Sequence, residues 1–440
     1  MNLLDPKAAF VIERLNHAGY EAYLVGGAVR DLIMNKEPKD TDITTSALPH
    51  ETKKVFEDYP IIETGLKHGT VTLLLNHTPI EITTFRIETG YSDGRHPDKV
   101  DFTKDITKDL SRRDFTMNSI AYNPVTGFVD PFNGKDDIKN GIIRCVGTPK
   151  ERFTEDSLRV LRAIRFASSS GFSIDGETER AMTECKHLLS NISMERVYSE
   201  IVKLLCGRNV KQVLLKYSGI ISVVIPEISR MAGFDQHNFH HKYDLLEHTA
   251  TVTESIEPVP HLRLAAFLHD VAKPRCMSFD DDGVGHFYGH PALGAKIADE
   301  ILQKLKCDNE TREKVVKLIK LHDNPIEENE RIIKRKLRSI GKDLLYDLIA
   351  LQKADTMGLA DEFQCRHEHF RILTEMTERI LEEEQCFSLK ALAVNGHDMI
   401  ECGFKGKEIG EKLNWLLEAV IDGKIENEKD ALIEQLKKDR

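Results

Sequence analysis

Two apolar patterns alternate along the first third of the chain. Residues 6–18 repeat apolar side chains at helical spacing and are followed by Gly19, which predicts a helix that stops there. Strands are predicted at 21–25, 70–75 and 80–85 and, in the more polar stretch DTDI, at 40–43, with a further helix at 49–57. This alternation indicates an α+β domain in which helices pack on a small mixed sheet.

The rest of the chain carries mainly the helical pattern. Residues 152–166 predict one helix, and residues 173–225 predict several more with a helical core and a polar face. Residues 86–104 are polar, contain glycine and proline, and are expected to form a mobile loop. The chain is therefore expected to be α+β at its N-terminal end and all-α beyond it.

Composition narrows the protein class without naming a function. A chain of 440 residues predicts roughly two to four domains. The net charge of −11 gives no overall basic signature of nucleic-acid binding, although a local basic cleft remains compatible with it. The eight cysteines form no CxxC pair and no signal peptide is apparent, so we expect reduced thiols in a cytoplasmic protein. No apolar run approaches the ~20 residues of a membrane helix.

The stretch at 20–45 carries the first candidate chemistry. Gly26 and Gly27 turn the backbone out of a strand and into a helix that begins near residue 28. Asp40 and Asp42 point to the same side of the next predicted strand. Two such carboxylates beside a glycine turn at a helix start can hold a divalent metal next to a phosphate, which suits phosphoryl or nucleotidyl transfer. A surface Asp-x-Asp and an ordinary turn are the alternative.

The order L-V-G-G-x-V-R-D and then D-x-D resembles the signature of the nucleotidyltransferase superfamily, specifically its tRNA nucleotidyltransferase (CCA-adding enzyme) and bacterial poly(A) polymerase branch. The resemblance implies that Asp40 and Asp42 are catalytic and bind Mg²⁺, and that Gly27 and Arg30 cradle a triphosphate. Glu81, between two isoleucines, is either a third carboxylate of this site or a solvent-facing residue, and the sequence leaves both open.

A second segment, RRDFTMNSIA at 112–121, resembles the next signature of the same family, which handles ribose and triphosphate. Arg113 can clamp phosphate through two hydrogen bonds. Asp114 and Asn118 lie four residues apart on a predicted helix, so both can face one ligand. A helix start with two cations is the plainer interpretation.

The predicted helix at 152–166 carries a polar strip with residues three apart, Asp156, Arg159, Arg162 and Arg165. The arginines could be solvated or paired with Glu151 and Glu155. However, EDxxRxLRxxRF is similar to the nucleobase-selection helix of the family. That resemblance implies that Asp156 and Arg159 bind the Watson–Crick edge of CTP or ATP, while Arg162 and Arg165 serve phosphate or the tRNA end.

Histidines become frequent after residue 226, and one constellation stands out from them. The order of a histidine, a His-Asp pair in an apolar helix and a distant aspartate resembles the HD phosphohydrolase superfamily. The resemblance implies the metal ligands His248, His269, Asp270 and Asp355. His290 and His322 match the extra ligands of two-metal members. Imidazole with carboxylate suits a divalent transition metal of undetermined identity, and satisfied surface histidines are the alternative.

The resemblance covers nearly the whole chain and implies four parts: a nucleotidyltransferase head at 1–145, an RNA-binding neck and body at 146–225, an HD domain at 226–385 and a helical tail at 386–440. The basic run at 328–345 and the tail lysines Lys405 and Lys407 could meet tRNA, and dimerisation is left open.

The resulting hypothesis is a template-independent enzyme that adds CCA to tRNA 3′ ends from CTP and ATP by two-metal in-line transfer. Its nearest alternatives are an A-adding enzyme, a C-adding enzyme and a poly(A) polymerase, and the polar loop at 86–104 counts against C-only addition. A main activity of the HD domain as a phosphohydrolase, or a non-catalytic RNA-binding role, are the alternatives from other classes.

Overall fold

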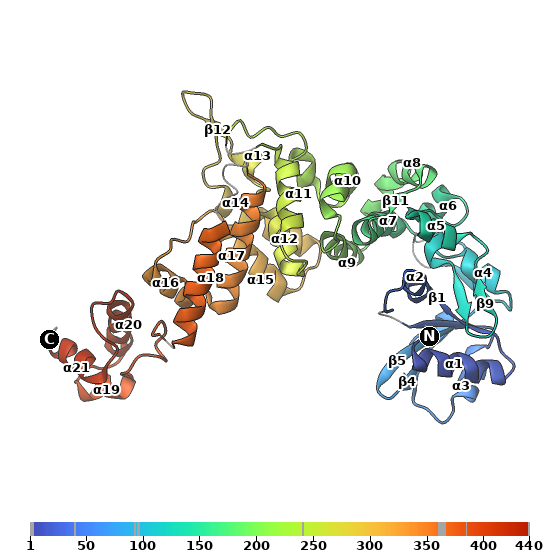
Figure 1. Cartoon of the computed structure of the whole chain (residues 1–440), viewed down its shortest axis with the longest axis horizontal. Helices are drawn as coiled ribbons and strands as arrows, with labels where there is room; N and C mark the ends of the chain where they lie inside the picture. Colours follow the sequence, from blue (N-terminus) through green and yellow to red (C-terminus); the bar gives the residue numbers. More distant parts are fainter. Residues whose placement is uncertain are drawn as a thin grey trace. The chain divides into compact units, whose positions relative to one another are not determined.

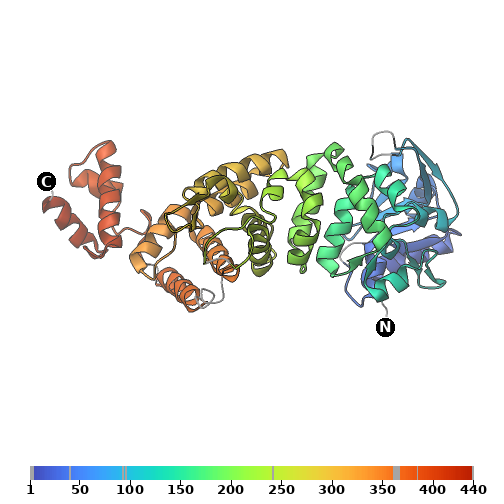
Figure 2. The same cartoon turned by 90° about the horizontal axis from the view of Figure 1, so that it is seen from above.

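The computed structural model describes residues 4–38, 41–91, 94, 97–239, 242–359, 367–383 and 385–438. Asp40, one of the two carboxylates predicted to be catalytic, lies outside these residues. The chain forms two compact units, Met1–Pro226 and Glu227–Arg440 (Figure 1; Figure 2). Each unit buries its own set of apolar side chains.

The first unit is built on a seven-stranded mixed sheet (Figure 1). The strand order is β3-β4-β5-β2-β1-β8-β9. The strands are β1 (Ala22–Val25), β2 (Asp42–Thr45), β3 (Ile61–Ile62), β4 (Thr70–Leu75), β5 (Thr78–Thr84), β8 (Ala121–Asn123) and β9 (Gly127–Val129). Only the pairing of β2 with β5 is parallel among these neighbours. The predicted α+β head with a small mixed sheet is confirmed.

Local sequence explains these elements. The buried side chains of α1 recur at i, i+3, i+4 and i+7, at Ala8, Val11, Ile12 and Leu15. Asp5 caps this helix by accepting a hydrogen bond from the Lys7 N–H at 3.0 Å. The helices of the head are α1 (Pro6–His17), α2 (Gly27–Ile33), α3 (Pro49–Val55), α4 (Ile106–Ser111) and α5 (Gly134–Asn140). The helices predicted at 6–18 and 49–57 and the strands predicted at 21–25, 70–75 and 80–85 are confirmed, whereas the strand expected at 40–43 runs from Asp42 to Thr45.

Two strands form in the stretch 86–104, for which the composition predicts a mobile loop, and residues 92, 93, 95 and 96 lie outside the described residues. β6 (Arg86–Thr89) and β7 (Lys99–Phe102) pair as an antiparallel hairpin. The polar side chains of β6 are held by ion pairs, because the Glu88 carboxylate lies 2.7 Å from Arg86 and 3.0 Å from Arg112. The Glu88 side chain is only 8% exposed. The polar side chains of β6 therefore indicate a tertiary ion-pair network and not a solvated loop.

The α-helix expected at 112–121 is also wrong. Only a short 3₁₀ turn, Thr116–Asn118, forms there. Phe115 is extended and bridges to Cys145, and the Val146 N–H donates to the Asp114 carbonyl at 3.1 Å. These long-range backbone bonds replace the bonds that a helix would make, so Asp114 and Asn118 do not share a helix face.

The single helix expected at 152–166 is broken. α6 (Pro149–Glu155) stops at Asp156, which is extended at φ −144° and ψ 99°, and α7 (Leu158–Ser170) starts after it. The Asp156 carboxylate accepts a hydrogen bond from the Leu158 N–H at 3.2 Å, which satisfies a free donor at the new helix start. The unit is completed by α8 (Gly176–Cys185), α9 (Met194–Leu205) and α10 (Val210–Val224).

Among its described residues, the second unit has helices and one small hairpin, β12 (Ser278–Phe279) with β13 (Gly285–His286). Its larger part holds α11 (Leu245–Ser255), α12 (Pro260–Leu268), α13 (Lys273–Cys276), α14 (His290–Lys304), α15 (Asn309–Leu321), α16 (Glu330–Ile340), α17 (Lys342–Met357) and α18 (His367–Glu382). The expected all-α remainder is confirmed. In the part of the chain that the structure describes, no helix is long and apolar enough to cross a membrane.

The last three helices, α19 (Gly396–Glu401), α20 (Lys407–Ile421) and α21 (Lys429–Lys438), share a small apolar core. The basic run at 328–345 falls largely on α16. Arg335 lies 2.6 Å from Asp422, and Arg338 contacts Glu418, both acids on or next to α20. Two cations of this run are therefore engaged in contacts with the tail.

Candidate active site and candidate metal centre

A cavity of about 830 Å³ lies in the first unit. It is lined by every described residue that the sequence predicts for catalysis or nucleotide binding in the head and neck: Gly27, Arg30, Asp42, Arg113, Asp114, Asn118, Asp156, Arg159, Arg162 and Arg165. These residues come from β2, α2, the segment 113–118 that ends in the 3₁₀ turn, and the region of α6 and α7. Segments far apart in sequence thus meet around one polar space.

The glycine turn stands at one side of this cavity. Gly26 has φ +70°, and a Cβ at this position would lie 3.3 Å from an Arg113 guanidinium nitrogen and 3.7 Å from an Asp42 carboxylate oxygen. A side chain here would be strained and would also crowd both groups. Glycine therefore lets the start of α2 approach the two charged residues closely.

Asp42 has a second carboxylate beside it. β2 and β5 run parallel, and Asp42 is in register with Glu81. Residues in register on neighbouring strands point to the same face of a sheet. Both are exposed, whereas Ile80 and Ile82 are buried on the opposite face. The sheet thus presents two adjacent carboxylates on its solvent side.

The second predicted signature forms a relay of hydrogen bonds. Arg30 donates to the Asn118 side-chain oxygen at 2.9 Å, and Asn118 donates to Asp114 at 3.1 Å. The other Asp114 oxygen accepts from Arg162 at 2.9 and 2.6 Å. Burial alone would raise the pKa of Asp114, but Arg162 and Asn118 lower that pKa to about 2. Asp114 and Asn118 thus adjoin each other, although no helix brings them together.

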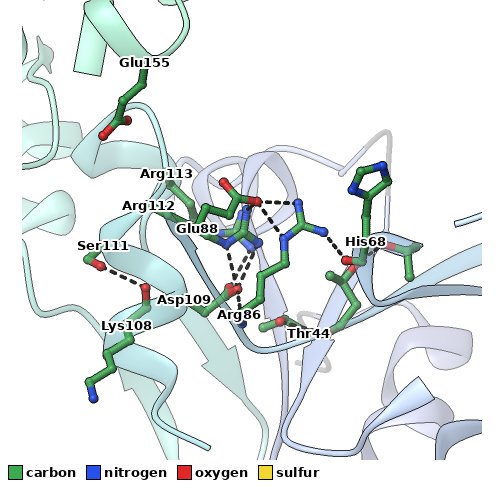
Figure 3. A network of polar contacts seen from close by, with 12 residues as sticks. Thr44, His68, Arg86, Glu88, Lys108, Asp109, Ser111, Arg112, Arg113 and Glu155 are labelled. Carbon is green, nitrogen blue, oxygen red and sulfur yellow. Dashed lines mark hydrogen bonds and ion pairs between the residues drawn. The ribbon is translucent and has the colours of Figure 1, made fainter. Parts of the chain in front are cut away.

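Figure 3 shows an ion-pair network next to this relay. Glu88 lies between the guanidinium groups of Arg86 and Arg112, and Arg112 also contacts Asp109 at 2.9 Å. Arg113 lies 3.4 Å from the other Asp109 oxygen. Sequence reasoning missed Glu88 and Asp109. The Arg-x-Glu spacing of residues 86–88, which puts both side chains on one face of a strand, was the available signal.

The two residues predicted to read the base are held by partners. The Asp156 carboxylate accepts from Arg196 at 2.7 Å. Arg159 donates to Glu155 at 2.8 Å and to the Arg112 carbonyl at 3.1 Å. The pairing with Glu155 is the one that the plainer interpretation expected. Arg196 lies on α9 and was not predicted as a site residue, since nothing local marks it among the other charges of that helix.

The candidate metal centre lies in the second unit. His248 on α11 has its Nε2 atom 3.1 Å from Asp355 and 3.3 Å from Asp270. His269, directly after α12, has its Nε2 atom 3.1 Å from Asp270 and 3.4 Å from Asp355. The His-Asp pair thus follows the apolar helix and is not inside it. The structure brings all four predicted ligands together.

A second group shares one of these residues. His290 Nε2 lies 3.4 Å and His322 Nε2 3.7 Å from the Asp270 oxygen that does not face the first group. The two sets that could hold an ion are His248, His269 and Asp270, and then Asp270, His290 and His322. Asp270 therefore bridges two adjacent positions with its two oxygens.

The donor set fits divalent cations. Each of the four histidines directs its Nδ1 atom at a backbone carbonyl, those of Gly358, Ala266, Phe287 and Ile319, at 2.7–3.0 Å. This turns every Nε2 atom toward the carboxylates of the centre, where a neutral imidazole offers its lone pair to a cation. Burial opposes charge, yet Asp270 and Asp355 raise the pKa of His269 to about 10, so a cation that binds at Nε2 has to displace a proton. His269 and Lys273 hold the pKa of Asp270 well below its usual range despite burial.

A cavity of about 290 Å³ adjoins the second metal group. Its lining includes Lys273, His290 and Asp323, together with the rings of His286, Phe287 and Tyr288. His286 and Tyr288 stack there with centroids 5.4 Å apart and planes within 11°. Tyr288 is 78% exposed, so the outer face of its ring can accept another planar group.

Comparisons with known proteins decide the family. The CCA-adding enzyme of Ligilactobacillus salivarius is 33% identical over 98% of this chain and 96% of its own length. The enzyme of the same name from Levilactobacillus brevis is 35% identical over 96% of this chain and 95% of its own. This chain belongs to the CCA-adding enzyme family. It is accordingly an enzyme of the tRNA nucleotidyltransferase class.

Other matches agree with this membership. A family model described as the poly A polymerase head domain matches residues 22–144, one for the RNA and SrmB-binding site of polymerase A matches 171–231, and one for tRNA nucleotidyltransferase domain 2 matches 292–436. The crystal structure of the Bacillus stearothermophilus CCA-adding enzyme in complex with CTP has a TM-score of 0.72 and 28% identity, covering 99% of this chain and 98% of that one. The Thermotoga maritima CCA-adding enzyme complexed with tRNA, at 20% identity and a TM-score of 0.61, shares the fold.

Proposed function

We propose that this member of the CCA-adding family extends tRNA 3′ ends with C, C and A from CTP and ATP, without a nucleic-acid template. The observation that carries the proposal is the single cavity shared by Gly27, Arg30 and Asp42 on one side and Asp156 and Arg159 on the other. The relatives named for CCA addition, and the solved relative that binds CTP, support it.

The triphosphate would lie near Arg30 and Arg113, because guanidinium groups match phosphate oxygens in bidentate fashion. Asn118 donates to Asp114 and accepts from Arg30, so it fixes the orientation of that arginine before the nucleotide arrives. The binding site is thus oriented in advance, which lowers the entropic cost of binding.

Asp156 and Arg159 would choose the base. A carboxylate accepts from the exocyclic amine that cytosine and adenine share, and a guanidinium donates to ring nitrogens or to cytosine O2. Guanine and uracil carry a carbonyl and an N–H on the corresponding edge, so they leave donors and acceptors unpaired. Arg196 and Glu155 hold the two side chains in place for this purpose.

Mg²⁺ would be held by Asp42 together with Asp40, and we add Glu81 as a third carboxylate because of its register with Asp42. Exposed carboxylates on one face of a sheet are ligands that Mg²⁺ prefers. When bound, the metals supply charge neutralisation to the attacking 3′-oxygen and to the departing pyrophosphate in an in-line displacement. The chain itself binds, orients and selects the nucleotide.

A direct test uses purified protein, Mg²⁺ and one tRNA made in three forms, ending at the discriminator base, at C or at CC. Each nucleoside triphosphate is offered singly and CTP is then offered with ATP. Growth of all three forms to one CCA end supports the proposal. Addition of one A to the CC form alone, or long A tails, would assign the protein to the A-adding or poly(A) branch instead.

Variants locate the site in the same assay. Asp42→Ala is expected to abolish extension, at least about 10³-fold, because a metal ligand is lost. Glu57→Ala, an exposed acid at the end of α3, is the matched control and should extend tRNA like the parent protein. Full extension by Asp42→Ala would show that the catalytic assignment is wrong.

We propose a second activity for the unit that contains the metal centre, hydrolysis of a phosphoester on a nucleoside. The two ligand groups that share Asp270 support a binuclear transition-metal site. When bound, such metals supply Lewis acidity toward a phosphoester. Lys273 lies 2.7 Å from Asp270 and lines the adjoining cavity, where it can attract the phosphate. The exposed Tyr288 ring supports a substrate with a nucleobase.

The metal content and phosphoesterase activity test this second proposal. His269→Ala with Asp270→Ala should lower bound transition metal and abolish hydrolysis of 2′,3′-cyclic and 2′-phosphorylated nucleotides, while tRNA extension persists. Tyr288→Ala should lose hydrolysis of nucleotides and keep that of a phenyl phosphate ester. His397→Ala, in a second His-Asp pair, is the control. Unchanged metal content in the double variant would contradict the assignment.

Several expectations stay predictions: the domain boundaries at 145, 225 and 385, the contact of the tail with tRNA, the homodimer and the cytoplasmic location. The match that ends at residue 144 and the limit of the first compact unit at Pro226 support the first two boundaries, whereas the match over 292–436 runs across the proposed boundary at 385. Limited proteolysis followed by mass spectrometry would test the boundaries, since cleavage should concentrate there.

A further inference from the structure

One aromatic ring stands at the centre of the arginines of the nucleotide cavity. The guanidinium carbons of Arg30, Arg162 and Arg165 lie 5.4, 5.6 and 3.8 Å from the centroid of the Phe166 ring. Phe166 is 6% exposed and lines the cavity together with all three. Arg30 comes from α2 of the head, whereas Arg162 and Arg165 come from α7. The ring therefore joins side chains from two parts of the unit.

Three like charges around one point need to be held apart and fixed in direction. Each arginine has an acidic partner, Asp31 at 2.9 Å, Asp114 at 2.6 Å and Glu200 at 2.6 Å. These acids balance the charge, but none of them contacts all three arginines. The negative face of an aromatic ring attracts a cation within about 6 Å and is the element that all three share.

The ring itself is well anchored. Phe166 meets the fully buried Phe115 edge to face, with centroids 5.7 Å apart and planes at 84°. Phe115 belongs to the extended segment that also positions Asp114. A ring fixed in this manner cannot turn away from the arginines, so it can define their positions.

We infer that Phe166 is a positioning residue for nucleotide binding: its ring electrostatics hold Arg30, Arg162 and Arg165 in the directions that receive the anionic groups of the substrates. The inference rests on the proposed function of the cavity. Arg159, which would read the base, is not among the three arginines. Phe166 should consequently affect the affinity for CTP and ATP alike, and not the choice of base.

The test replaces Phe166 with 4-fluoro-, 3,5-difluoro- and 3,4,5-trifluorophenylalanine in the full-length protein. Each fluorine weakens the negative potential of the ring face while the shape changes little. We expect KM for CTP and for ATP to rise stepwise, by about tenfold over the series, since three contacts of this type weaken together. The value of kcat should change less than about twofold, and discrimination against GTP and UTP should not change.

The control series is placed at Phe153, which is fully buried on α6 of the same unit and for which the described residues show no cation over the ring. A flat KM along the Phe166 series, or an equal rise along the Phe153 series, would overturn the inference. Phe166→Leu with an unchanged KM would also overturn it. If the parent protein adds no nucleotide in this assay, the proposed function fails first, and the two failures are therefore distinguishable.

Discussion

At the scale of single residues, burial and charge set opposing demands on Asp114. Burial favours the neutral carboxylic acid, whereas the Arg162 guanidinium at 2.6 Å favours the carboxylate, and the result is a pKa of about 2. The residue remains charged at any physiological pH. It can therefore orient Asn118 and Arg162 without becoming a proton donor.

This lowered pKa predicts a pH dependence of stability. In the unfolded chain the pKa of Asp114 returns to about 3.8, so the unfolded state binds a proton first as pH falls. The contribution of Asp114 to stability is complete above pH 5, about 1 kcal/mol is lost by pH 3, and nearly all is lost near pH 1. In Arg162→Met this acid-side loss should be smaller. Urea unfolding at pH 6 and pH 3 measures it, with Arg180→Met on α8 as control.

A substitution of Glu81 tests whether this residue is a ligand of Mg²⁺. If it completes the carboxylate set with Asp42, Glu81→Gln should lower kcat for nucleotide addition by about 10² to 10³ and raise the Mg²⁺ concentration needed for half activity. Glu21→Gln, which changes an exposed acid just before β1, is the control. Normal Mg²⁺ dependence in Glu81→Gln would show that Glu81 is only a solvent-facing strand residue.

At the scale of elements, long-range contacts decided the three segments where sequence patterns failed. The polar stretch after β5 became a hairpin because Glu88 pairs with Arg112, 24 residues away. Phe115 is extended because the backbone on either side of it bonds to residues 144 and 146. The break between α6 and α7 turns Asp156 toward Arg196, 40 residues away. In each case a partner distant in sequence overrides the local preference.

The hairpin should therefore depend on Glu88. Glu88→Gln keeps the shape of the side chain and removes the charge between Arg86 and Arg112, and a broken buried pair costs about 3–5 kcal/mol. We expect urea unfolding of the first unit to show a loss near the lower end, about 3 kcal/mol, since Gln can still accept hydrogen bonds. Glu13→Gln, on the exposed face of α1, should change the free energy of unfolding by less than about 0.5 kcal/mol.

At the scale of the whole molecule, two compact units each hold one candidate site. The nucleotide cavity is lined by residues of the first unit, and the metal-ligand groups lie in the second. A ligand that binds one unit should consequently stabilise that unit. No ligand of one site is taken from the other unit among the described residues.

Calorimetry can separate the two units. We expect two thermal transitions, and a divalent transition metal at 100 times its dissociation constant should stabilise one of them by about 2.7 kcal/mol. His269→Ala should abolish that shift, because it removes a ligand shared with Asp270 and Asp355. CTP with Mg²⁺ should move only the other transition. A metal that shifts both transitions in His269→Ala would refute the assignment of the centre.

The sequence by itself predicted ten of the residues that line the nucleotide cavity and all six histidines and aspartates of the candidate metal centre, but not Glu88 or Arg196. Short sequence patterns contain many of these residues, among them Gly27, Asp42, Asp114, Arg159 and the His-Asp pair. The spacing within such a pattern can be seen in the sequence, whatever the fold of the chain. The strands and helices with a strong apolar period were predictable for a related reason, since burial of one face depends on spacing alone.

Only the tertiary structure decided how the residues are paired. Arg162 donates a hydrogen bond to Asp114, 48 residues away. Asp42 lies beside Glu81 because β2 and β5 are paired in that register. The ring of Phe166 contacts arginines from two helices. Charge pairs and ring contacts act over a few ångströms of space and leave no period in the sequence. Their partners become visible only when distant segments are brought together by the fold.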